Sequence, residues 1–225
     1  MLQRSEDGKR RRNPPAGRER SVLPGGRNFL LLTMSSVISV TGSGFSTVAL
    51  PFAVLRIGGS GSDLGYVGAA AVLPLIACLL LGGVVADRLP RNRIIAGGNA
   101  VQALGQGTAA VLLLTGQARI WELVLLAAAG GLASGFYLPA ASGLLPQTVT
   151  PGERSRANAI SRAGMNTASI CGTALGGLAA GAAGPGWGLA ADALSFAVAG
   201  ALLAGLRFPA SDTPEAHAGS ASAQA

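Results

Sequence analysis

The sequence has few charged residues, and this scarcity limits what kind of protein it can be. Only 12% of its 225 residues are Asp, Glu, Lys or Arg, about half the share of roughly 25% in soluble domains. Eleven of the 27 charged side chains (17 basic and 10 acidic) lie in residues 1–27 and two in the last eighteen. The remaining fourteen could not solvate a soluble domain running from Asn28 to Arg207. Because 49% of the chain is hydrophobic, the composition predicts a membrane protein.

Histidine, lysine and cysteine are also rare, and this argues against several kinds of active site. The one histidine, His217, lies in a polar tail, where no fold surrounds it to build a catalytic or zinc site. Lys9 is followed by Arg10 and not by the Ser or Thr of a phosphate-binding loop. Cys78 and Cys171 each lie in an apolar run, where thiols behave as small hydrophobic groups. We therefore expect no enzyme, no cofactor and no metal site.

Uncharged segments mark the predicted membrane spans. A charge at the bilayer centre costs at least about 2.5 kcal/mol, and a helix needs roughly 20 residues to cross. The last uncharged gap has 44 residues, is interrupted only by Asp192, and contains the turn-forming run Gly184-Pro185-Gly186, so it predicts two spans. The predicted fold is an all-α, polytopic membrane protein with six transmembrane helices. These helices cover residues 29–54, 64–85, 94–114, 122–145, 161–183 and 187–206.

The basic residues predict the orientation of these spans, because cytoplasmic loops carry an excess of Lys and Arg. Six spans place both termini on one side of the membrane. Two basic residues, Arg56 and Arg119, fall on one face, and fifteen fall on the other. The fifteen are Arg4, Lys9, Arg10, Arg11, Arg12, Arg18, Arg20, Arg27, Arg88, Arg91, Arg93, Arg154, Arg156, Arg162 and Arg207. We predict a multi-pass protein of the cell (inner or plasma) membrane with both termini in the cytoplasm.

Two polar tails flank the predicted bundle. Residues 1–27 form a basic tail with a Lys9–Arg12 cluster, which we expect to be disordered and cytoplasmic. Such a cluster is also typical of nucleic-acid patches, but the hydrophobic body follows directly, so we favour attraction to the lipid bilayer over a nucleic-acid partner. Residues 28–207 form the six-helix half-bundle of the prediction, and residues 208–225 a cytoplasmic linker or tail.

Small residues spaced four apart occur in the fourth and fifth predicted helices. Lipid tails give helices no hydrophobic reason to associate, whereas small residues allow two backbones to approach closely. The pairs are Gly131 and Gly135, Gly172 and Gly176, and Gly177 and Gly181. We predict that these glycines lie at helix–helix contacts, although the pattern is widespread in membrane bundles.

The loop after the second predicted helix combines small, acidic and basic residues. Gly83, Asp87, Arg88 and Arg91 fall on a pattern that resembles the signature loop of the major facilitator superfamily, between its second and third helices. Pro90 stands where that pattern has a second glycine. Asn92 replaces its last basic residue, and Arg93 follows one step later. The other interpretation is an ordinary basic cytoplasmic loop. The resemblance implies that Asp87 locks a cytoplasmic gate by pairing with Arg88 or Arg91.

Three further stretches resemble the enterobactin-exporter-like and macrolide-efflux-like bacterial permeases of that superfamily. They are Gly135-Phe136-Tyr137-Leu138-Pro139-Ala140 with Leu144-Leu145-Pro146, Arg156-Ala157-Asn158-Ala159, and Asp192-Ala193-Leu194-Ser195-Phe196. All occur in the expected order, and the resemblance covers about residues 28–208. In the fifth helix, Thr173 stands where antiporter-type members have proline.

The resemblance implies a particular function and a missing partner. Members of the family have two six-helix halves around a substrate cavity, and this chain supplies the first. We expect the amino-terminal half of a secondary active transporter that exports a small molecule, such as a drug or siderophore, by alternating access. The substrate would cross near the first, fourth and fifth helices, and a second half or a homodimer would complete the cavity. The alternative is a half-permease that transports nothing alone and acts as a membrane interaction partner.

Asp192 is the one acidic residue deep within a predicted span. Carboxylates inside a membrane commonly bind substrate or protons, so Asp192 is a candidate coupling or substrate residue. A structural role is nearly as well supported, because Asp192 lies a few residues after Gly186 and could bond Ser195 or the helix backbone.

Overall fold

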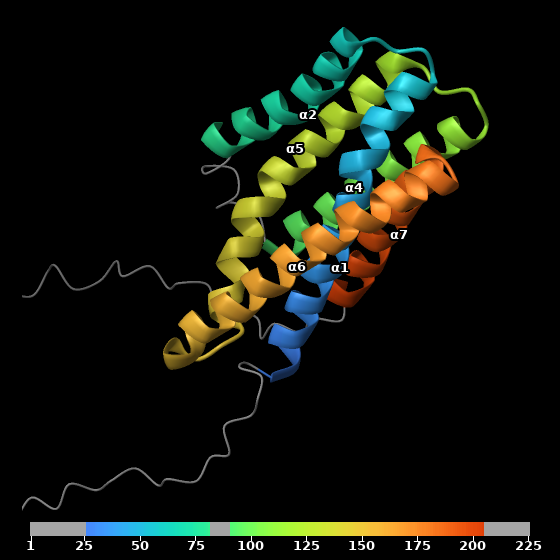
Figure 1. The fold of residues 1–225 in the computed structure, drawn as a ribbon. Coiled ribbons are helices and arrows are strands. Elements are labelled where there is room, and N and C mark those ends of the chain that lie inside the picture. Colours follow the sequence, from blue (N-terminus) through green and yellow to red (C-terminus); the bar gives the residue numbers. More distant parts are fainter. Residues whose placement is uncertain (1–25, 82–90, 205–225) are drawn as a thin grey trace, which may run out of the picture.

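A computed structural model describes residues 26–81 and 91–204 of the chain, and within them every long element is a helix (Figure 1). The helices are α1 (Gly26–Arg56), α2 (Gly61–Leu81), α4 (Arg91–Leu114), α5 (Ile120–Leu144), α6 (Arg154–Ala182) and α7 (Pro185–Ala204). Two short 3₁₀ helices, η1 (Leu145–Gln147) and η2 (Pro151–Glu153), join α5 to α6. The prediction of six long helices is confirmed. The predicted tails and the loop residues Gly83, Asp87 and Arg88 lie outside the described residues.

The fifth helix begins earlier than predicted. We expected a start at residue 161, but α6 begins at Arg154, two turns before. Uncharged length reports only the part of a helix that lies in hydrocarbon, and the first turns of α6 contain Arg154, Arg156 and Asn158. A helix can continue through such residues where water solvates them, so the predicted boundary was wrong.

The helices differ in how strongly their composition suits a membrane. By length and hydropathy, α1, α2, α5 and α7 are each apolar enough to cross a bilayer. The other two long helices carry polar residues along their length, including Asn99 and Gln102 in α4 and Arg162 and Asn166 in α6. Because polar groups inside a membrane face the bundle interior or water, these two helices indicate where a polar path could lie.

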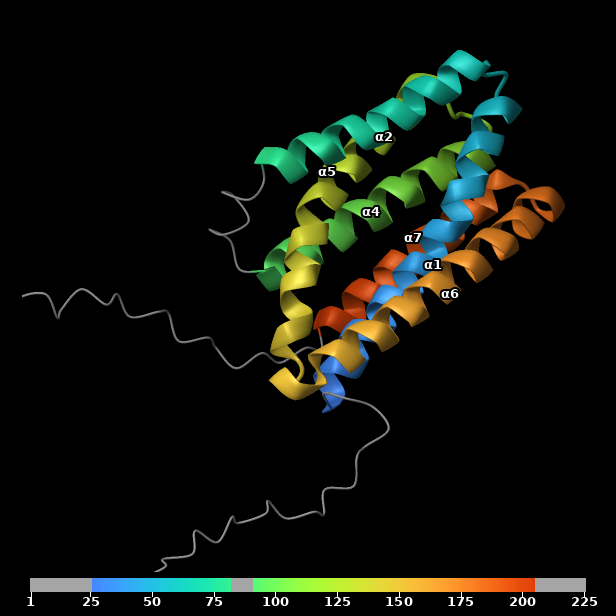
Figure 2. The same ribbon diagram turned by 60° about the vertical axis from the view of Figure 1, so that its left-hand side comes forward.

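The helices pack in a repeating arrangement (Figures 1 and 2). Helix α1 packs along α6 and α7, whereas α5 packs along α2 and α4. Helices α4 and α7 pack on each other, and α2 makes few contacts with α1. Exchanging α1 with α5, α2 with α6 and α4 with α7 therefore reproduces the main contacts, although α6 also touches α7 whereas α2 and α4 have no comparable contact. Since α1 and α5 run in opposite directions, this is the pattern of two inverted three-helix repeats.

An apolar cluster lies towards each end of the bundle. One contains Val54, Leu123 and Leu189, at the end of α1 and the beginnings of α5 and α7. The other contains Leu32 and Ile95 at the opposite end, packed against Ala140 and Leu144 of α5. The buried polar residues, among them Ser39, Asn99 and Asp192, lie in the bundle interior.

Four of the six predicted glycines lie where two helices touch: Gly131 and Gly135 of α5 against α2, and Gly172 and Gly176 of α6 against α1. A Cβ added at Gly172 would collide with the backbone of Thr41. Gly177 and Gly181 are different, because nothing in the described residues lies within 4 Å of an added Cβ. The two glycine pairs of α6 therefore have the same spacing but different surroundings, one against α1 and the other with open space.

We expect Gly172→Ala to lower the free energy of unfolding by about 1–3 kcal/mol, since the α1 backbone must shift to admit the methyl group. The matched control is Gly177→Ala on the same helix, which has open space and should leave stability unchanged or slightly raised. Thermal unfolding of the detergent-solubilised chain measures both. Equal effects of the two substitutions would show that Gly172 does not hold α6 against α1.

Candidate substrate cavity and buried carboxylate

Helix α4 presents amide side chains on one face. Asn99, Gln102 and Gln106 are spaced three and four residues apart, which places them along one side of a helix. Gln102 lies between two cavities in the bundle, and each of the other two amides lines one of them. The polar residues that weaken α4 as a membrane span therefore point to interior space.

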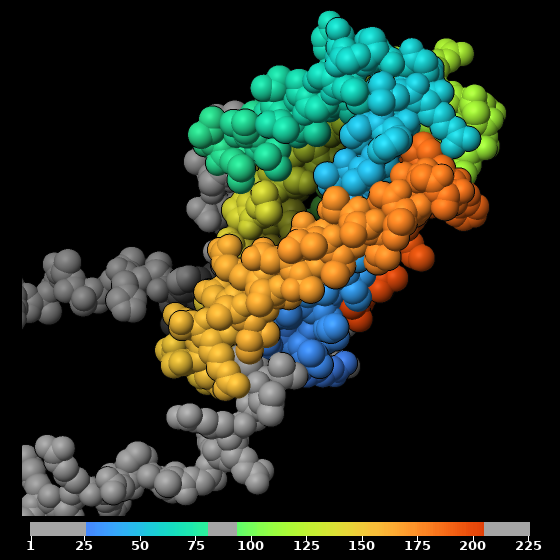
Figure 3. Space-filling model, viewed as in Figure 1, coloured from blue at the N-terminus to red at the C-terminus, as the bar shows by residue number. Residues whose placement is uncertain are grey.

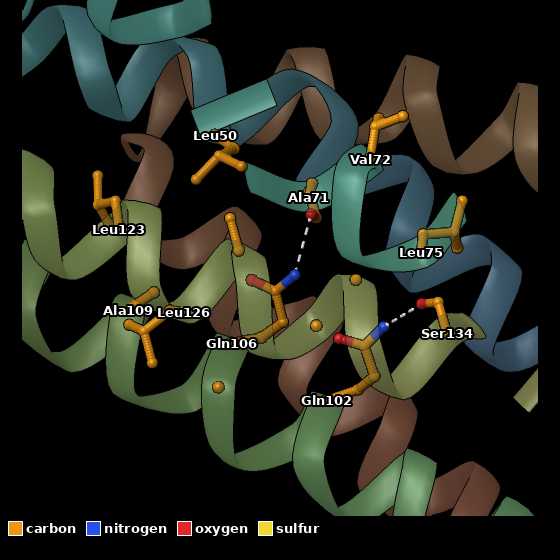
Figure 4. Close-up of a pocket in the computed structure, with 15 residues that line it drawn as sticks. Leu50, Ala71, Val72, Leu75, Gln102, Gln106, Ala109, Leu123, Leu126 and Ser134 are labelled. Carbon is orange, nitrogen blue, oxygen red and sulfur yellow. Dashed lines mark hydrogen bonds between the residues drawn. The ribbon is translucent and has the colours of Figure 1, made fainter. Parts of the chain in front are cut away.

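The larger cavity, of about 300 Å³, lies between α1, α2, α4 and α5 (Figure 4). Most of its lining is apolar, and its polar groups come from Ser46, Gln102, Gln106 and Ser134. None of the fifteen described residues that line it is charged. In the space-filling view the molecule is hollowed between α2 and α1, with α5 at the floor (Figure 3). Its volume is at the lower end of the range for small-molecule pockets.

Two hydrogen bonds connect the helices around this cavity. Gln102 Nε2 donates to Ser134 Oγ of α5 at 2.9 Å, and Gln106 Nε2 donates to Ser46 Oγ of α1 at 3.2 Å (Figure 4). Each amide also carries a carbonyl oxygen and a second N–H. A ligand could therefore exchange hydrogen bonds with the wall without leaving the amides unpaired.

A smaller cavity of about 170 Å³ lies beside the first, between α1, α4, α5 and α7. Gln102 and Ser134 line both cavities, and Asn99 and Tyr137 line the smaller one. Asn99 is 2% exposed, and its Nδ2 donates to the Ile95 carbonyl at 2.9 Å, while its Oδ1 has no partner among the described residues. A buried acceptor beside such a cavity is a place for water or for a polar group of a ligand.

Asp192 lies in the second turn of α7 and is fully buried. Helix α1 passes directly over it at Gly42, where an added Cβ would lie 2.9 Å from Asp192 Oδ1. The hydroxyl of Ser195 donates to the main-chain carbonyl of Asp192 at 2.7 Å. Neither carboxylate oxygen has a hydrogen-bond partner in the described part of the chain. The structure thus places this acid inside the six-helix half, at the contact of α1 and α7.

The structure separates the predicted site residues into distinct places. Of the helices expected to line the substrate path, the first (α1) and fourth (α5) line the larger cavity, but the fifth (α6) does not, and α2 and α4 take part. Arg91 begins α4, while its companions in the gate motif are outside the described residues. No three His, Cys, Asp or Glu side chains of residues 26–81 and 91–204 lie close enough together to hold a metal ion.

Sequence reasoning missed most of the cavity lining. Gln102, Gln106, Ser46 and Ser134 belong to none of the family patterns found in the sequence. The spacing of the three amides in α4 was a usable signal, since polar residues repeated on one face of a membrane helix indicate an interior path.

We expect the larger cavity to be open to water, which cysteine substitutions can test. In a chain carrying Cys78→Ala and Cys171→Ala, Ser134→Cys should react with a water-soluble thiol reagent, because thiolate forms readily only where water is present. Leu104→Cys, 71% exposed on the outer surface of α4, is the matched control and should stay unlabelled in lipid. Mass spectrometry of the chain in lipid nanodiscs gives the readout. Labelling at residue 104 but not at residue 134 would contradict a hydrated cavity.

Comparison with known proteins supports a transporter. The profile of the Major Facilitator Superfamily matches residues 32–224. The multidrug efflux pump Tap of Mycolicibacterium fortuitum is 30% identical over 157 residues, which cover 67% of this chain and 38% of that protein. Tap of Mycobacterium tuberculosis (strain ATCC 25618 / H37Rv) is 32% identical over 165 residues, covering 68% and 38%. The chain thus spans about two fifths of the length of these relatives. It belongs to the Major Facilitator Superfamily, a family of multi-pass membrane transporters and not of enzymes.

Proposed function

We propose that this chain is the amino-terminal half of a secondary active efflux transporter that exports a small organic molecule, such as a drug or siderophore, by alternating access. The observation that carries the proposal is a cavity inside a membrane bundle that combines a mostly apolar lining with the amide and hydroxyl groups of Gln102, Gln106, Ser46 and Ser134. Similarity to multidrug efflux pumps supports export as its direction. The excess of basic residues supports a cell-membrane location with both termini in the cytoplasm.

The lining favours uncharged or amphipathic substrates. Apolar side chains such as Leu50, Val72 and Leu126 offer contacts without directional demands, and the amides of Gln102 and Gln106 can each donate or accept. A wall of this kind accepts varied shapes, since few polar groups have to be matched exactly.

A second six-helix half, or a second copy of this chain, is the partner in this proposal. The outward face of α6 carries Arg162, Asn166 and Ser169, all exposed in the described structure, and continues through Gly177. Polar side chains that face lipid are costly, so protein or water must cover this face. The relatives contain more than twice the matched length, which is sufficient for another half.

The exposed polar face of α6 and the greater length of the relatives also favour the alternative, which is a half-permease that has no transport activity alone and acts only as a membrane interaction partner. It differs from the leading proposal in what happens when the second half is supplied.

Efflux assays separate the two. We expect a drug-sensitive host to export a fluorescent lipophilic dye when this chain is expressed with the second six-helix half that its own locus encodes, after residue 225 or in a neighbouring gene. The chain alone should export none, because one wall cannot close both sides of a path. Within the active pair, Gln102→Leu should weaken apparent affinity about three- to tenfold by removing a hydrogen-bonding wall group. Gln117→Leu, in the α4–α5 loop, is the matched control.

Absence of any second half at the locus, together with no dye export by the chain, would overturn the transport proposal and leave the interaction partner.

The loop containing Gly83, Asp87, Arg88 and Arg91 is proposed as a cytoplasmic gate. Its acid would pair with Arg88 or Arg91 and lie against the positive end of a helix of the second half. We expect Asp87→Asn in the active pair to lower dye export and to increase thiol labelling of cavity positions from the cytoplasmic side, because the closed gate loses its charge pairing.

Glu153→Gln, an acid of the η2 turn that accepts a hydrogen bond from Thr150, is the control for a general loss of loop charge. Normal export and normal labelling with Asp87→Asn would remove this loop from the gate.

A further inference from the structure

Asp192 is separated from the larger cavity by a single hydroxyl side chain. Gly42 of α1 lies against Asp192 and Ser195 of α7, and Ser46, one helical turn further along α1, is on the same face of that helix. Neither serine makes a hydrogen bond with the carboxylate oxygens. Ser195 is held by the main-chain carbonyl of Asp192 itself. Ser46 has a different second neighbour, because it also lines the larger cavity.

Gln106 connects Ser46 to the cavity wall. Its Nε2 donates to Ser46 Oγ at 3.2 Å, and Gln106 also lines the cavity. A serine hydroxyl accepts hydrogen bonds and still has one hydrogen to donate. With Gln106 on one lone pair, Ser46 keeps a free lone pair and a rotatable hydrogen between the carboxylate and the cavity. The side chains therefore form a series from Asp192 through Ser46 to the cavity.

No charged side chain faces Asp192 from the elements packed on it, within the residues that the structure describes. The charged residues of these elements lie towards helix ends: Arg27 and Arg56 on α1, Arg91 and Arg93 on α4, and Arg154, Arg156 and Arg162 on α6. Arg56 is ten residues beyond Ser46, about 15 Å along the helix. The remaining titratable group on these helices is Cys171, which is exposed on α6. Among the described residues the carboxylate has no counter-ion, so we expect a proton or water to satisfy it.

We propose that Asp192 is a proton-binding site that exchanges its proton with the substrate cavity through Ser46. In the exchange, the carboxyl proton passes to Ser46 Oγ while the Ser46 hydroxyl proton passes to a water molecule in the cavity, and the reverse path reloads the acid. Charge and atoms are conserved, because the proton lost by Asp192 appears on the cavity water. This inference rests on the proposed function, because it names the proton as the ion that would drive export through the same cavity.

The series of side chains also links proton and substrate. A substrate that takes the Gln106 amide as its own donor removes that N–H from Ser46, so the hydrogen bonding around Asp192 changes when the cavity is occupied. By linkage, the proton then changes the affinity for substrate by the same factor. Gly42 adds a steric condition, since a larger residue there would press on Asp192 and Ser195.

Infrared difference spectroscopy of the purified chain in lipid nanodiscs tests the proton site without any need for transport. We expect a carboxylic acid C=O band that titrates with pH and is absent in Asp192→Asn. On transfer to heavy water the band should shift as the carboxyl proton exchanges. Ser46→Ala should slow this exchange at least about tenfold by removing the relay group. Ser46→Thr keeps a hydroxyl and should restore it.

Thr47→Ala is the matched control, because this neighbouring hydroxyl bonds the Ser43 carbonyl of its own helix and should leave the exchange rate unchanged. Circular dichroism establishes that each variant is folded. Three results would each overturn the inference: no band assignable to Asp192 at any pH, a normal exchange rate in Ser46→Ala, or equal slowing in Thr47→Ala. Dye export by the pair without such exchange would contradict this inference alone, and exchange in the chain without dye export by the pair would contradict the proposed function alone.

Discussion

The structure depends on one constraint, which is that a polar group in hydrocarbon must be satisfied inside the protein or by water held within it. The constraint forces the backbone into helices and directs the amides of α4 inward, where Gln102 and Gln106 join α4 to α5 and α1. It also decides where the bundle can be hollow. A cavity next to these amides gives them water or ligand as partners, and apolar residues of one cluster, among them Ala109 and Leu123, form part of its wall.

Close backbone contacts of α5 with α2 and of α6 with α1 determine where the larger cavity lies. Gly131 and Gly135 bring α5 directly against α2, and Gly172 and Gly176 bring α6 against α1. Because α2 is held by α5 and makes few contacts with α1, the space between α1 and α2 is left to the cavity. The two contacts join equivalent pairs of helices in the two inverted repeats, although their glycines lie on α5 in one and on α6 in the other, which the exchange does not relate.

The sequence predicted what depends on local composition and failed where tertiary placement decides. Uncharged length located six helices and placed Asp192 within the last, but it could not detect the first two turns of α6, which are helical although they carry Arg154 and Arg156, both exposed. Glycine spacing could not distinguish Gly172 and Gly176, which lie against α1, from Gly177 and Gly181, where an added Cβ would meet no described residue, because spacing does not say which face of a helix is covered. The pairing of Ser46 with Gln106 joins residues 60 positions apart and has no local signature.

The position of Asp192 separates proton binding, which this half could do alone, from substrate passage, which needs a second half. The acid, Ser46 and Gln106 all lie within one six-helix unit, so a proton site built from them is complete without a partner. The outward polar face of α6 is not complete in this sense, because nothing in the described chain covers it. A substrate path that moves between two sides of the membrane needs that second wall, whereas proton binding does not. In the proposed mechanism, a substrate held between the two halves would therefore change the hydrogen bonding around Asp192, an acid that belongs to this half alone.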